Sequence, residues 1–277
     1  MSIPSLSLEG KVAIVTGAAG ERGVGQAVAM TFAEAGADVA ICDHVVDVYD
    51  RDLEARAEEI RKLGRRALAI RADVSRKSDV DSMVKKVEDE LGPVDILVNN
   101  AAILGPASFK AFECTDEAWD ETMAVDLKSH YLCSMAVGKG MMERKTGNII
   151  NIDSIEGQTP MMMPGRPYCV AKAAVQFLTR MHARQLGEYN IRVNSISPGA
   201  IETDMGHHNM WYAGIKKKPA NLDDPDRKLF TPQILERIPL HRIAEPGEIA
   251  SIALFLATEG ASYITGAIIV ADGGLAV

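Results

Sequence analysis

The run Lys11-Val12-Ala13-Ile14-Val15-Thr16 leads directly into the glycine-rich stretch Gly17-Ala18-Ala19-Gly20-Glu21-Arg22-Gly23-Val24-Gly25. Because the run is short and apolar and is bounded by glycines, it predicts a strand that is buried on both faces. Helix-favouring residues follow from about Gln26 to Ala35. These segments predict a strand, a tight glycine turn and a helix.

The same alternation continues to the end of the chain. Further strands are predicted at 37–42, 67–70, 94–98, 148–152, 191–196 and 267–270, and further helices at 50–63, 77–91, 116–144, 166–186 and 246–257. Strands that alternate with helices form a parallel sheet covered on both faces, and right-handed crossovers make it doubly wound. We therefore predict a single α/β domain over residues 1–277, with a doubly wound parallel sheet of about seven strands. Ligands are expected at the carboxyl ends of the strands.

Composition and charge limit the functional class. The chain has 277 residues, of which 47% are hydrophobic and 25% charged, as in ordinary globular proteins. Its net charge of −8 argues against a nucleic-acid binder, which is usually basic. No apolar run is long enough to span a bilayer, and the N-terminus has no signal-peptide pattern. The four cysteines form no Cys-x-x-Cys pair, which predicts buried free thiols and a reducing, cytoplasmic location.

The glycine-rich stretch is a candidate phosphate site. Its glycines let the backbone approach a pyrophosphate, and the helix that follows offers free N–H groups. The stretch does not match Gly-x-Gly-x-x-Gly, so a plain strand-to-helix turn is the alternative. Asp43 ends the second strand, 18 residues beyond Gly25. Its carboxylate can accept hydrogen bonds from an adenosine ribose and would repel a 2′-phosphate, the alternative being a solvated loop acid.

Two further strand ends carry polar side chains. Asp73 follows the third strand and is a candidate for contact with an adenine edge, with a helix cap as the alternative. Asn99 and Asn100 end the fourth strand with amides that can hold a loop together. All of these features fall at the carboxyl ends of consecutive strands, where a dinucleotide would lie.

Tyr168 and Lys172 are four residues apart in a predicted helix and therefore share one face. A phenol is a poor acid or base near neutral pH because its pKa is about 10. A fixed ammonium favours the phenolate, so Lys172 is expected to lower the pKa of Tyr168. The pair alone could be a chance surface pair, and its meaning comes from the motifs around it.

Taken in order, the motifs resemble those of the short-chain dehydrogenase/reductase family in its common form. The matching stretches are Thr16-Gly17 with Gly23-Val24-Gly25, Asn99-Asn100-Ala101-Ala102, Asn151-Ile152-Asp153-Ser154, Tyr168 with Lys172, Pro198-Gly199-Ala200-Ile201-Glu202-Thr203, and Asp272-Gly273-Gly274. Tyr168 follows Ser154 by 14 residues, close to the usual gap of the family. The resemblance covers about Leu8 to Gly274 and implies a Rossmann-like fold.

Three departures from the family pattern matter. Two extra residues lie between Gly17 and Gly23, so the pyrophosphate contacts are expected to shift. Ala102 stands in place of a glycine. Asp126 stands where the family usually has an asparagine that helps to hold a water in a proton relay, and an ionised carboxylate cannot donate a hydrogen bond. Asp126 could keep the local helix geometry or pair electrostatically with Lys172, and it is included among the catalytic candidates on that basis.

The resemblance implies hydride transfer between a nicotinamide and a carbinol or carbonyl carbon. In oxidation Tyr168 would act as the general base, Ser154 would donate a hydrogen bond to the substrate oxygen, and Lys172 would also hold the nicotinamide ribose. The implied cofactor contacts are Gly17, Arg22, Gly23, Val24, Gly25, Asp43, Asp73, Val74, Asn100, Ala101, Tyr168, Lys172, Pro198, Gly199, Ile201 and Thr203. Asp43 favours NAD over NADP, whereas Arg22 near the adenosine would favour NADP.

Two segments are predicted to contact the substrate. Three adjacent methionines between Ser154 and Tyr168 suggest an adaptable apolar wall, with loop packing or an oligomer contact as the alternative. The segment 206–237 is a long insertion in a compact domain, which is more often functional than idle, and it occupies the substrate-lid position of the family. The candidate substrate residues are Glu156, Met162, Met163, Met205 and Trp211. We expect a mid-sized cyclic or aromatic secondary alcohol and no metal site.

Three functions remain open. An NAD-dependent alcohol dehydrogenase is favoured over an NADPH-dependent ketone reductase, and cofactor preference separates the two. The third is a sensor or scaffold that binds a dinucleotide without enzyme activity. The intact Ser154, Tyr168 and Lys172 argue against it, whereas Asp126 and the longer glycine stretch keep it open. The resemblance also implies a homo-oligomer, a tetramer or dimer assembled through the long helices.

Overall fold

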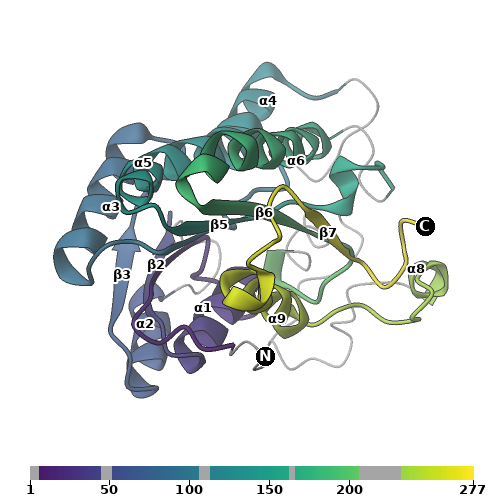
Figure 1. Ribbon diagram of the computed structural model, residues 1–277. Coiled ribbons are helices and arrows are strands. Elements are labelled where there is room, and N and C mark those ends of the chain that lie inside the picture. Colours follow the sequence, from purple (N-terminus) through teal and green to yellow (C-terminus); the bar gives the residue numbers. More distant parts are fainter. Residues whose placement is uncertain (1–5, 45–51, 106–112, 162–165, 206–231) are drawn as a thin grey trace.

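The computed structural model describes residues 6–44, 52–105, 113–161, 166–205 and 232–277 (Figure 1). Within them, one seven-stranded sheet has the order β3-β2-β1-β4-β5-β6-β7, and every neighbouring pair is parallel. The strands are β1 (Val12–Thr16), β2 (Asp38–Asp43), β3 (Ala67–Arg71), β4 (Ile96–Asn99), β5 (Gly147–Ile152), β6 (Ile191–Pro198) and β7 (Ile268–Ala271). The predicted doubly wound fold is confirmed, and each strand overlaps the range predicted for it.

The central strands are buried because apolar side chains lie on both of their faces. All residues of β1 and β4 are buried. Ile14 of β1 pairs with Ala40 of β2 on one side and with Leu97 of β4 on the other. Strands covered on both faces read as continuous apolar runs, which is why the sequence revealed them. The strand order reverses between β1 and β4, which opens a crevice at their carboxyl ends.

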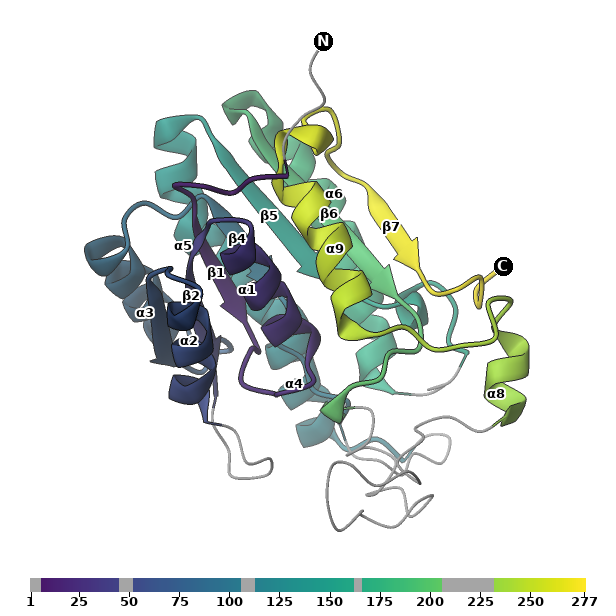
Figure 2. The same ribbon diagram turned by 90° about the horizontal axis from the view of Figure 1, so that it is seen from below.

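Helices cover both faces of the sheet (Figures 1 and 2). One face carries α1 (Val24–Glu34), α2 (Leu53–Lys62) and α9 (Pro246–Ala257), which share one apolar core. The other carries α3 (Lys77–Glu90), α5 (Ser129–Arg144) and α6 (Pro167–Leu186), which pack in a second core. The shorter elements are α4 (Asp116–Met123), η1 (Ala124–Lys128), η2 (Ile155–Gly157), η3 (Gly187–Tyr189), α8 (Pro232–Arg237) and η5 (Glu259–Ala261).

The long helical region predicted at 116–144 is present, but it is not α-helical throughout. Between α4 and α5 lies the single π-helical turn η1, which carries Asp126. The Oδ1 atom of Asp126 accepts a hydrogen bond from the Ile103 N–H at 2.8 Å. Turns of this kind inside α-helices are frequent at functional sites. Here the turn places a carboxylate of the helix against the segment that follows β4.

Several expectations concern the rest of the chain. Most of the predicted lid at 206–237 lies outside the described residues, which include only α8 from it. Among the helices that the structure describes, none has the length and apolar character needed to cross a membrane. All four cysteines are free thiols, of which Cys42 and Cys133 are buried. The expectation of burial was wrong for Cys114 and Cys169, which are partly exposed.

Candidate active site

The glycine-rich stretch crosses from β1 to α1 with backbone packed against backbone. Gly17 has a φ of +67°, in the left-handed region that favours glycine. A Cβ atom on Gly17 would lie 2.7 Å from the Ala101 Cα atom, and one on Gly25 would lie 2.5 Å from the Gly17 carbonyl oxygen. Gly23 is the N-cap of α1 and forms no side-chain cap. A helix N-terminus formed by glycine backbone suits a phosphate ligand.

Thr16 and Asn100 tie the ends of β1 and β4 together beneath this stretch. The Thr16 Oγ1 atom accepts hydrogen bonds from the N–H groups of Asn100 at 3.0 Å and Ala101 at 3.1 Å. In return, the Asn100 amide donates to the carbonyl oxygens of Thr16 at 2.9 Å and Gly17 at 3.0 Å. The prediction that this asparagine pair holds a loop is confirmed for Asn100. Asn99 instead faces the core, where its amide donates to Asn151 Oδ1 at 2.9 Å.

Asp43 lies at the end of β2 beside the glycine-rich stretch. Its Oδ2 atom accepts a hydrogen bond from the Ala19 N–H at 2.9 Å, which orients the carboxylate. A carboxylate has about four acceptor sites, so it can also accept from a ribose hydroxyl. The position and the charge of Asp43 both suit the ribose of an adenosine.

Arg22 of the lengthened glycine-rich stretch contacts a distant segment. The Arg22 N–H donates to Asp204 Oδ2 at 3.1 Å. Asp204 follows Thr203 in the segment that leaves β6, on which Ile201 forms an isolated bridge with Ala244. The longer loop therefore joins the two segments between which a dinucleotide would extend.

Asp73 serves first as an anchor for the start of α3. Its Oδ1 atom accepts from the Ser75 N–H at 3.0 Å and from the Ser75 hydroxyl at 2.6 Å, and Arg76 lies 3.1 Å from Oδ2. Burial alone would raise the pKa of Asp73, but the Ser75 hydrogen bonds and the charges of His44 and Arg76 lower it overall. Val74 beside it is buried. These contacts hold the turn that precedes α3, but the N-cap of that helix is Arg76, so the helix-cap alternative for Asp73 was wrong.

Ser154 lies just beyond β5, where the chain enters η2. Its backbone is extended, with a φ of −167°. The hydroxyl accepts from the Glu156 N–H at 3.2 Å, and the carbonyl oxygen accepts from the Gln176 side chain of α6 at 3.3 Å. Gly157 lies close to α6, since a Cβ atom on it would be 2.6 Å from the Lys172 carbonyl carbon. Ser154 is thereby fixed against the helix that carries Tyr168.

Tyr168 and Lys172 lie in the first turns of α6, which begins at Pro167. The Lys172 ammonium donates to the Ile152 carbonyl oxygen at 2.9 Å and lies 5.5 Å from the centroid of the Tyr168 ring. Lys172 is only 1% exposed. Burial lowers the pKa of Lys172, and the charges of Asp126 and Asp153 oppose that shift. The predicted triad of Ser154, Tyr168 and Lys172 is therefore brought together at the end of β5.

The acidity of Tyr168 differs from the expectation. Burial is the largest influence and raises the pKa of Tyr168; the charge of Asp126 adds to it, while hydrogen bonding to Ser154 opposes it. The prediction that Lys172 brings this pKa down was wrong for the structure as it stands, because burial and nearby carboxylates dominate. The phenol is thus held in its protonated form.

Asp126 is fully buried and interacts electrostatically with Lys172, one of the two roles left open for it. Burial raises the pKa of Asp126 to about 7, although the charge of Lys172 and the Ile103 hydrogen bond oppose the shift. His130 and Asp153 also lie in this buried group, and the motif analysis assigned neither of them a role. Burial lowers the pKa of His130 and raises that of Asp153 to about 6. The signal for Asp153 was an acidic residue directly after a buried strand and next to Ser154.

The other predicted contacts are placed as follows. Pro198 ends β6, and the Gly199 N–H donates to the Ala271 carbonyl oxygen at 3.0 Å. Glu156 is buried, and its Oε2 atom accepts from the Met161 N–H at 3.1 Å, so it holds the loop rather than an exposed pocket wall. Met205 is partly exposed. The remaining substrate candidates, Met162, Met163 and Trp211, lie outside the described residues.

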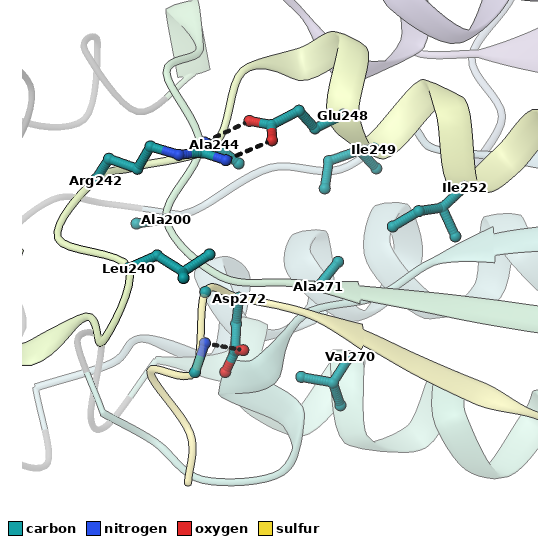
Figure 3. Close-up of a pocket in the computed structure, with 12 residues that line it drawn as sticks. Ala200, Leu240, Arg242, Ala244, Glu248, Ile249, Ile252, Val270, Ala271 and Asp272 are labelled. Atoms are coloured by element: carbon teal, nitrogen blue, oxygen red, sulfur yellow. Dashed lines mark hydrogen bonds and ion pairs between the residues drawn. The ribbon is translucent and has the colours of Figure 1, made fainter.

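A separate cavity of about 610 Å³ lies between α9 and β7, and Figure 3 shows the residues that line it. Ile249 and Ile252 of α9 contribute apolar surface, and Arg242 forms an ion pair with Glu248 at 2.7 Å beside them. The cavity lies against α9, whereas Tyr168 belongs to α6 on the opposite face of the sheet. It is therefore not the candidate active site.

Comparison with known proteins agrees with this arrangement. Residues 17–276 match a family model described as Enoyl-(Acyl carrier protein) reductase. The chain belongs to the short-chain dehydrogenase/reductase family. It is similar to the 2,3-dihydro-2,3-dihydroxybenzoate dehydrogenase of Bacillus subtilis, with 35% identity over 96% of each chain. It is also similar to the 3-oxoacyl-[acyl-carrier-protein] reductase FabG of Staphylococcus epidermidis, with 36% identity over 96% of this chain and 98% of the relative.

Solved structures give the same result. A short-chain type dehydrogenase/reductase from Mycobacterium marinum aligns with a TM-score of 0.82 and 33% identity, over 98% of this chain and 97% of that chain. As a member of this family, the protein is an oxidoreductase that uses a nicotinamide dinucleotide. Among the described residues, no group of three or more His, Cys, Asp or Glu side chains could hold a metal ion.

Proposed function

We propose that the protein is an NAD-dependent dehydrogenase that oxidises a mid-sized cyclic or aromatic secondary alcohol to a ketone. The observation that carries the proposal is the convergence of Ser154, Tyr168 and Lys172 at the end of β5. The phenol, the hydroxyl and the ammonium come from two elements locked together by the Gln176 hydrogen bond and the close approach of Gly157. Burying these polar groups together costs stability, which favours a role for them in chemistry on a bound molecule.

The residues of the cofactor end fit a dinucleotide. Gly17 and Gly25 allow the close backbone packing that forms the loop, since a Cβ atom at either position would collide with Ala101 or Gly17, and Asp43 is oriented at the end of β2. When bound, the nicotinamide supplies the hydride acceptor. Tyr168 takes the proton of the alcohol, Ser154 donates a hydrogen bond to the substrate oxygen, and the buried Lys172 charge favours the phenolate that forms.

The preference for NAD over NADP rests on Asp43. Its carboxylate would face a 2′-phosphate directly and repel it. Arg22 supports the opposite preference, and its backbone N–H donates to Asp204. The charge at Asp43 is fixed in place by Ala19, and we therefore give it the greater weight.

The substrate class is supported by the Bacillus subtilis relative, whose name describes dehydrogenation of a cyclic dihydroxy compound. The three adjacent methionines in the sequence between Ser154 and Tyr168 are consistent with an apolar wall for such a ring, and Met161, which the structure describes, is partly buried. An apolar ring with one secondary alcohol would be oriented by Ser154.

Reduction of a ketone is the second candidate, and one observation favours it. Burial raises the pKa of Tyr168, so at neutral pH the residue is a proton donor rather than an acceptor. A proton donor is what ketone reduction needs at the substrate oxygen. The Staphylococcus epidermidis relative carries a reductase name.

The test begins with fluorescence titrations of NADH and NADPH into the purified protein. We expect tighter binding of NADH, followed by turnover of cyclic or aromatic secondary alcohols with NAD⁺. Tyr168→Phe should lower turnover by about 100-fold or more and leave NADH affinity unchanged. Tyr263→Phe, at a fully exposed tyrosine outside the site, is the matched control and should turn over normally.

Each alternative has its own outcome. Tighter NADPH binding would replace the dehydrogenase with the ketone reductase. Full activity of Tyr168→Phe would refute the assigned mechanism. If neither nucleotide binds, the sensor or scaffold hypothesis loses its ligand as well, and the proposed function fails completely.

We also propose that the chain forms a homo-oligomer through α4, α5 and α6. These helices expose large apolar side chains, of which Phe177 is 69% exposed. The rings of Tyr131 on α5 and His182 on α6 have centroids 6.3 Å apart, so the two helices present adjacent surfaces. The exposed set on the three helices is Trp119, Tyr131, Met135, Val170, Phe177 and Met181. A monomeric mass at micromolar concentration would contradict this assembly.

A further inference from the structure

The end of β5 carries a carboxylate that the proposed chemistry leaves unused. Asp153 immediately precedes Ser154 and is 3% exposed. Its Oδ2 atom accepts a 2.5 Å hydrogen bond from the Ser195 hydroxyl of β6. Ser197 of β6 and Gln176 of α6 also hydrogen-bond to this carboxylate. Burying a charged group is costly even when it is hydrogen-bonded, so a charge at this position points to a role in the site.

The geometry connects Asp153 to Lys172. The Lys172 ammonium donates to the carbonyl oxygen of Ile152, the residue directly before Asp153. Asp153 and Asp126 both act electrostatically on that ammonium, one from the end of β5 and the other from η1. The Oδ2 atom of Asp126 has no donor among the described residues. Two buried carboxylates thus act on one buried ammonium.

When both carboxylates are ionised, their two negative charges exceed the one positive charge of Lys172. Burial raises the pKa of both, that of Asp153 to about 6 and that of Asp126 to about 7. Interacting sites of this kind titrate as a unit. The charges of both carboxylates also raise the pKa of Tyr168. The titratable groups of this cluster are Lys172 and Tyr168, on which Asp153 acts, together with Asp126 and Glu156, which act on Tyr168, and His130, which interacts with Lys172.

We propose that Asp153 is a positioning residue of the catalytic site, which fixes the Lys172 ammonium at the end of β5 and places a second negative charge, besides that of Asp126, near Tyr168. The assignment rests on the proposed function, since it identifies a group that determines the pH at which Tyr168 exchanges a proton. Asp153 reaches the reacting atoms only through Lys172 and through the backbone that it shares with Ser154.

The test is Asp153→Asn, which keeps an acceptor for Ser195 and removes the charge. A negative charge stabilises the ammonium of Lys172 and the protonated phenol of Tyr168, so its removal lowers both pKa values. The titration of Lys172 is followed by NMR of protein labelled with [13Cε]lysine, and Lys172→Met assigns the resonance. We expect the Lys172 midpoint to fall by about one pH unit. Asp38→Asn, at the opposite end of the sheet, should leave it unchanged.

Kinetics supply the second readout. In Asp153→Asn, the pH at which kcat/KM for alcohol oxidation is half-maximal should also fall by about one unit. A merely structural role would lower the rate at every pH and leave the midpoint in place. Asp153→Ser repeats both measurements with a smaller side chain in case the amide does not pack.

The outcomes separate the two proposals. An unchanged Lys172 midpoint in the folded Asp153 variants overturns the positioning role, whatever the activity. A lowered midpoint in a protein that oxidises no alcohol and reduces no ketone upholds the assignment of Asp153 to Lys172 and refutes the proposed function.

Discussion

The glycine-rich loop (residues 17–25) and the buried catalytic group meet at the same edge of the sheet, but different interactions hold them. In the loop, polar atoms find partners. Thr16 Oγ1 accepts from two backbone N–H groups, the Asn100 amide donates to two carbonyl oxygens, and Asp43 accepts from Ala19. Close contacts between backbone atoms complete the packing. The loop is therefore fixed before any ligand arrives.

The buried catalytic group, formed by Asp126, His130, Asp153, Tyr168 and Lys172, is held differently from the loop. Among the described residues, the buried Oδ2 atom of Asp126 has no hydrogen-bond partner, and Asp153 and His130 are hydrogen-bonded but removed from water. All three have a pKa that burial shifts toward the neutral form. Groups in this state destabilise the fold but exchange protons near neutral pH. Substitutions in the loop should therefore destroy stability, whereas some substitutions in the catalytic group should increase it.

The largest effect is expected from Gly25→Ala in the loop. Its Cβ atom would lie 2.5 Å from the Gly17 carbonyl oxygen and 2.6 Å from the Asn100 Nδ2 atom. Since the first of these atoms belongs to the backbone, the loop must move as a whole. We expect a loss of about 3 kcal/mol in the free energy of unfolding, measured by urea denaturation, together with loss of NADH binding.

Gly138→Ala in α5 is the matched control. A Cβ atom on Gly138 would meet nothing within 4 Å. Alanine in place of glycine inside a helix should stabilise the protein by about 0.5–1 kcal/mol. If Gly25→Ala behaves like this control, the loop is not held by backbone packing and the comparison fails.

Asp126→Asn is expected to have an intermediate effect and to raise, rather than lower, the free energy of unfolding at neutral and higher pH. The pKa of Asp126 is about 7 in the folded protein and about 3.9 in the unfolded chain. The folded state therefore binds more protons between these values, and its stability falls as the pH rises from about 4 to about 7. The amide can still accept from Ile103 but has no charge. Above pH 7 the variant should be more stable than the wild type by about 2 kcal/mol, an advantage that shrinks toward pH 4.

Asp38→Asn tests the same substitution at a partnered carboxylate. Burial would raise the pKa of Asp38, but hydrogen bonds and ion pairing with Arg66 lower it overall. A lowered pKa contributes stability above the unfolded value, and that stability is lost as the pH falls through the folded value. Denaturation at neutral pH should show a loss of about 1 kcal/mol that diminishes below about pH 4. Equal signs for the two variants at pH 8 would contradict the contrast between the regions.

Much of the fold could be predicted because its signals are local. The buried strands are apolar on both faces, so runs such as 11–16 and 191–196 stand out without any tertiary information. The π-turn at Asp126 could not be predicted, because it depends on a hydrogen bond from Ile103 in another segment. Periodicity describes a helix through its own neighbours and carries no record of such a partner.

The residues of the catalytic site could be predicted from the sequence, but their electrostatics could not. The positions of Ser154, Tyr168 and Lys172 followed from their order and spacing, and the structure brings them together. The direction of the pKa shift at Tyr168 was wrong because it depends on burial and on carboxylates that approach from η1 and β5. Asp153 was missed because its neighbour Ser154 explained the motif. Electrostatics at a buried site depends on three-dimensional distances that residue spacing does not encode.

The smallest effect should come from Asp73→Ala, where the comparison can be sharpened within the cofactor end itself. Asp73 accepts from Ser75 and pairs with Arg76 in the turn before α3, so like Thr16 and Asn100 it holds a loop of the site together. We expect a loss of about 0.5 kcal/mol in unfolding free energy and less than a twofold change in NADH affinity. The reverse result, unchanged stability with NADH affinity reduced tenfold, would assign Asp73 to the adenine instead. Because both quantities come from the same variant, the experiment decides whether this carboxylate belongs to the framework of the site or to its ligand.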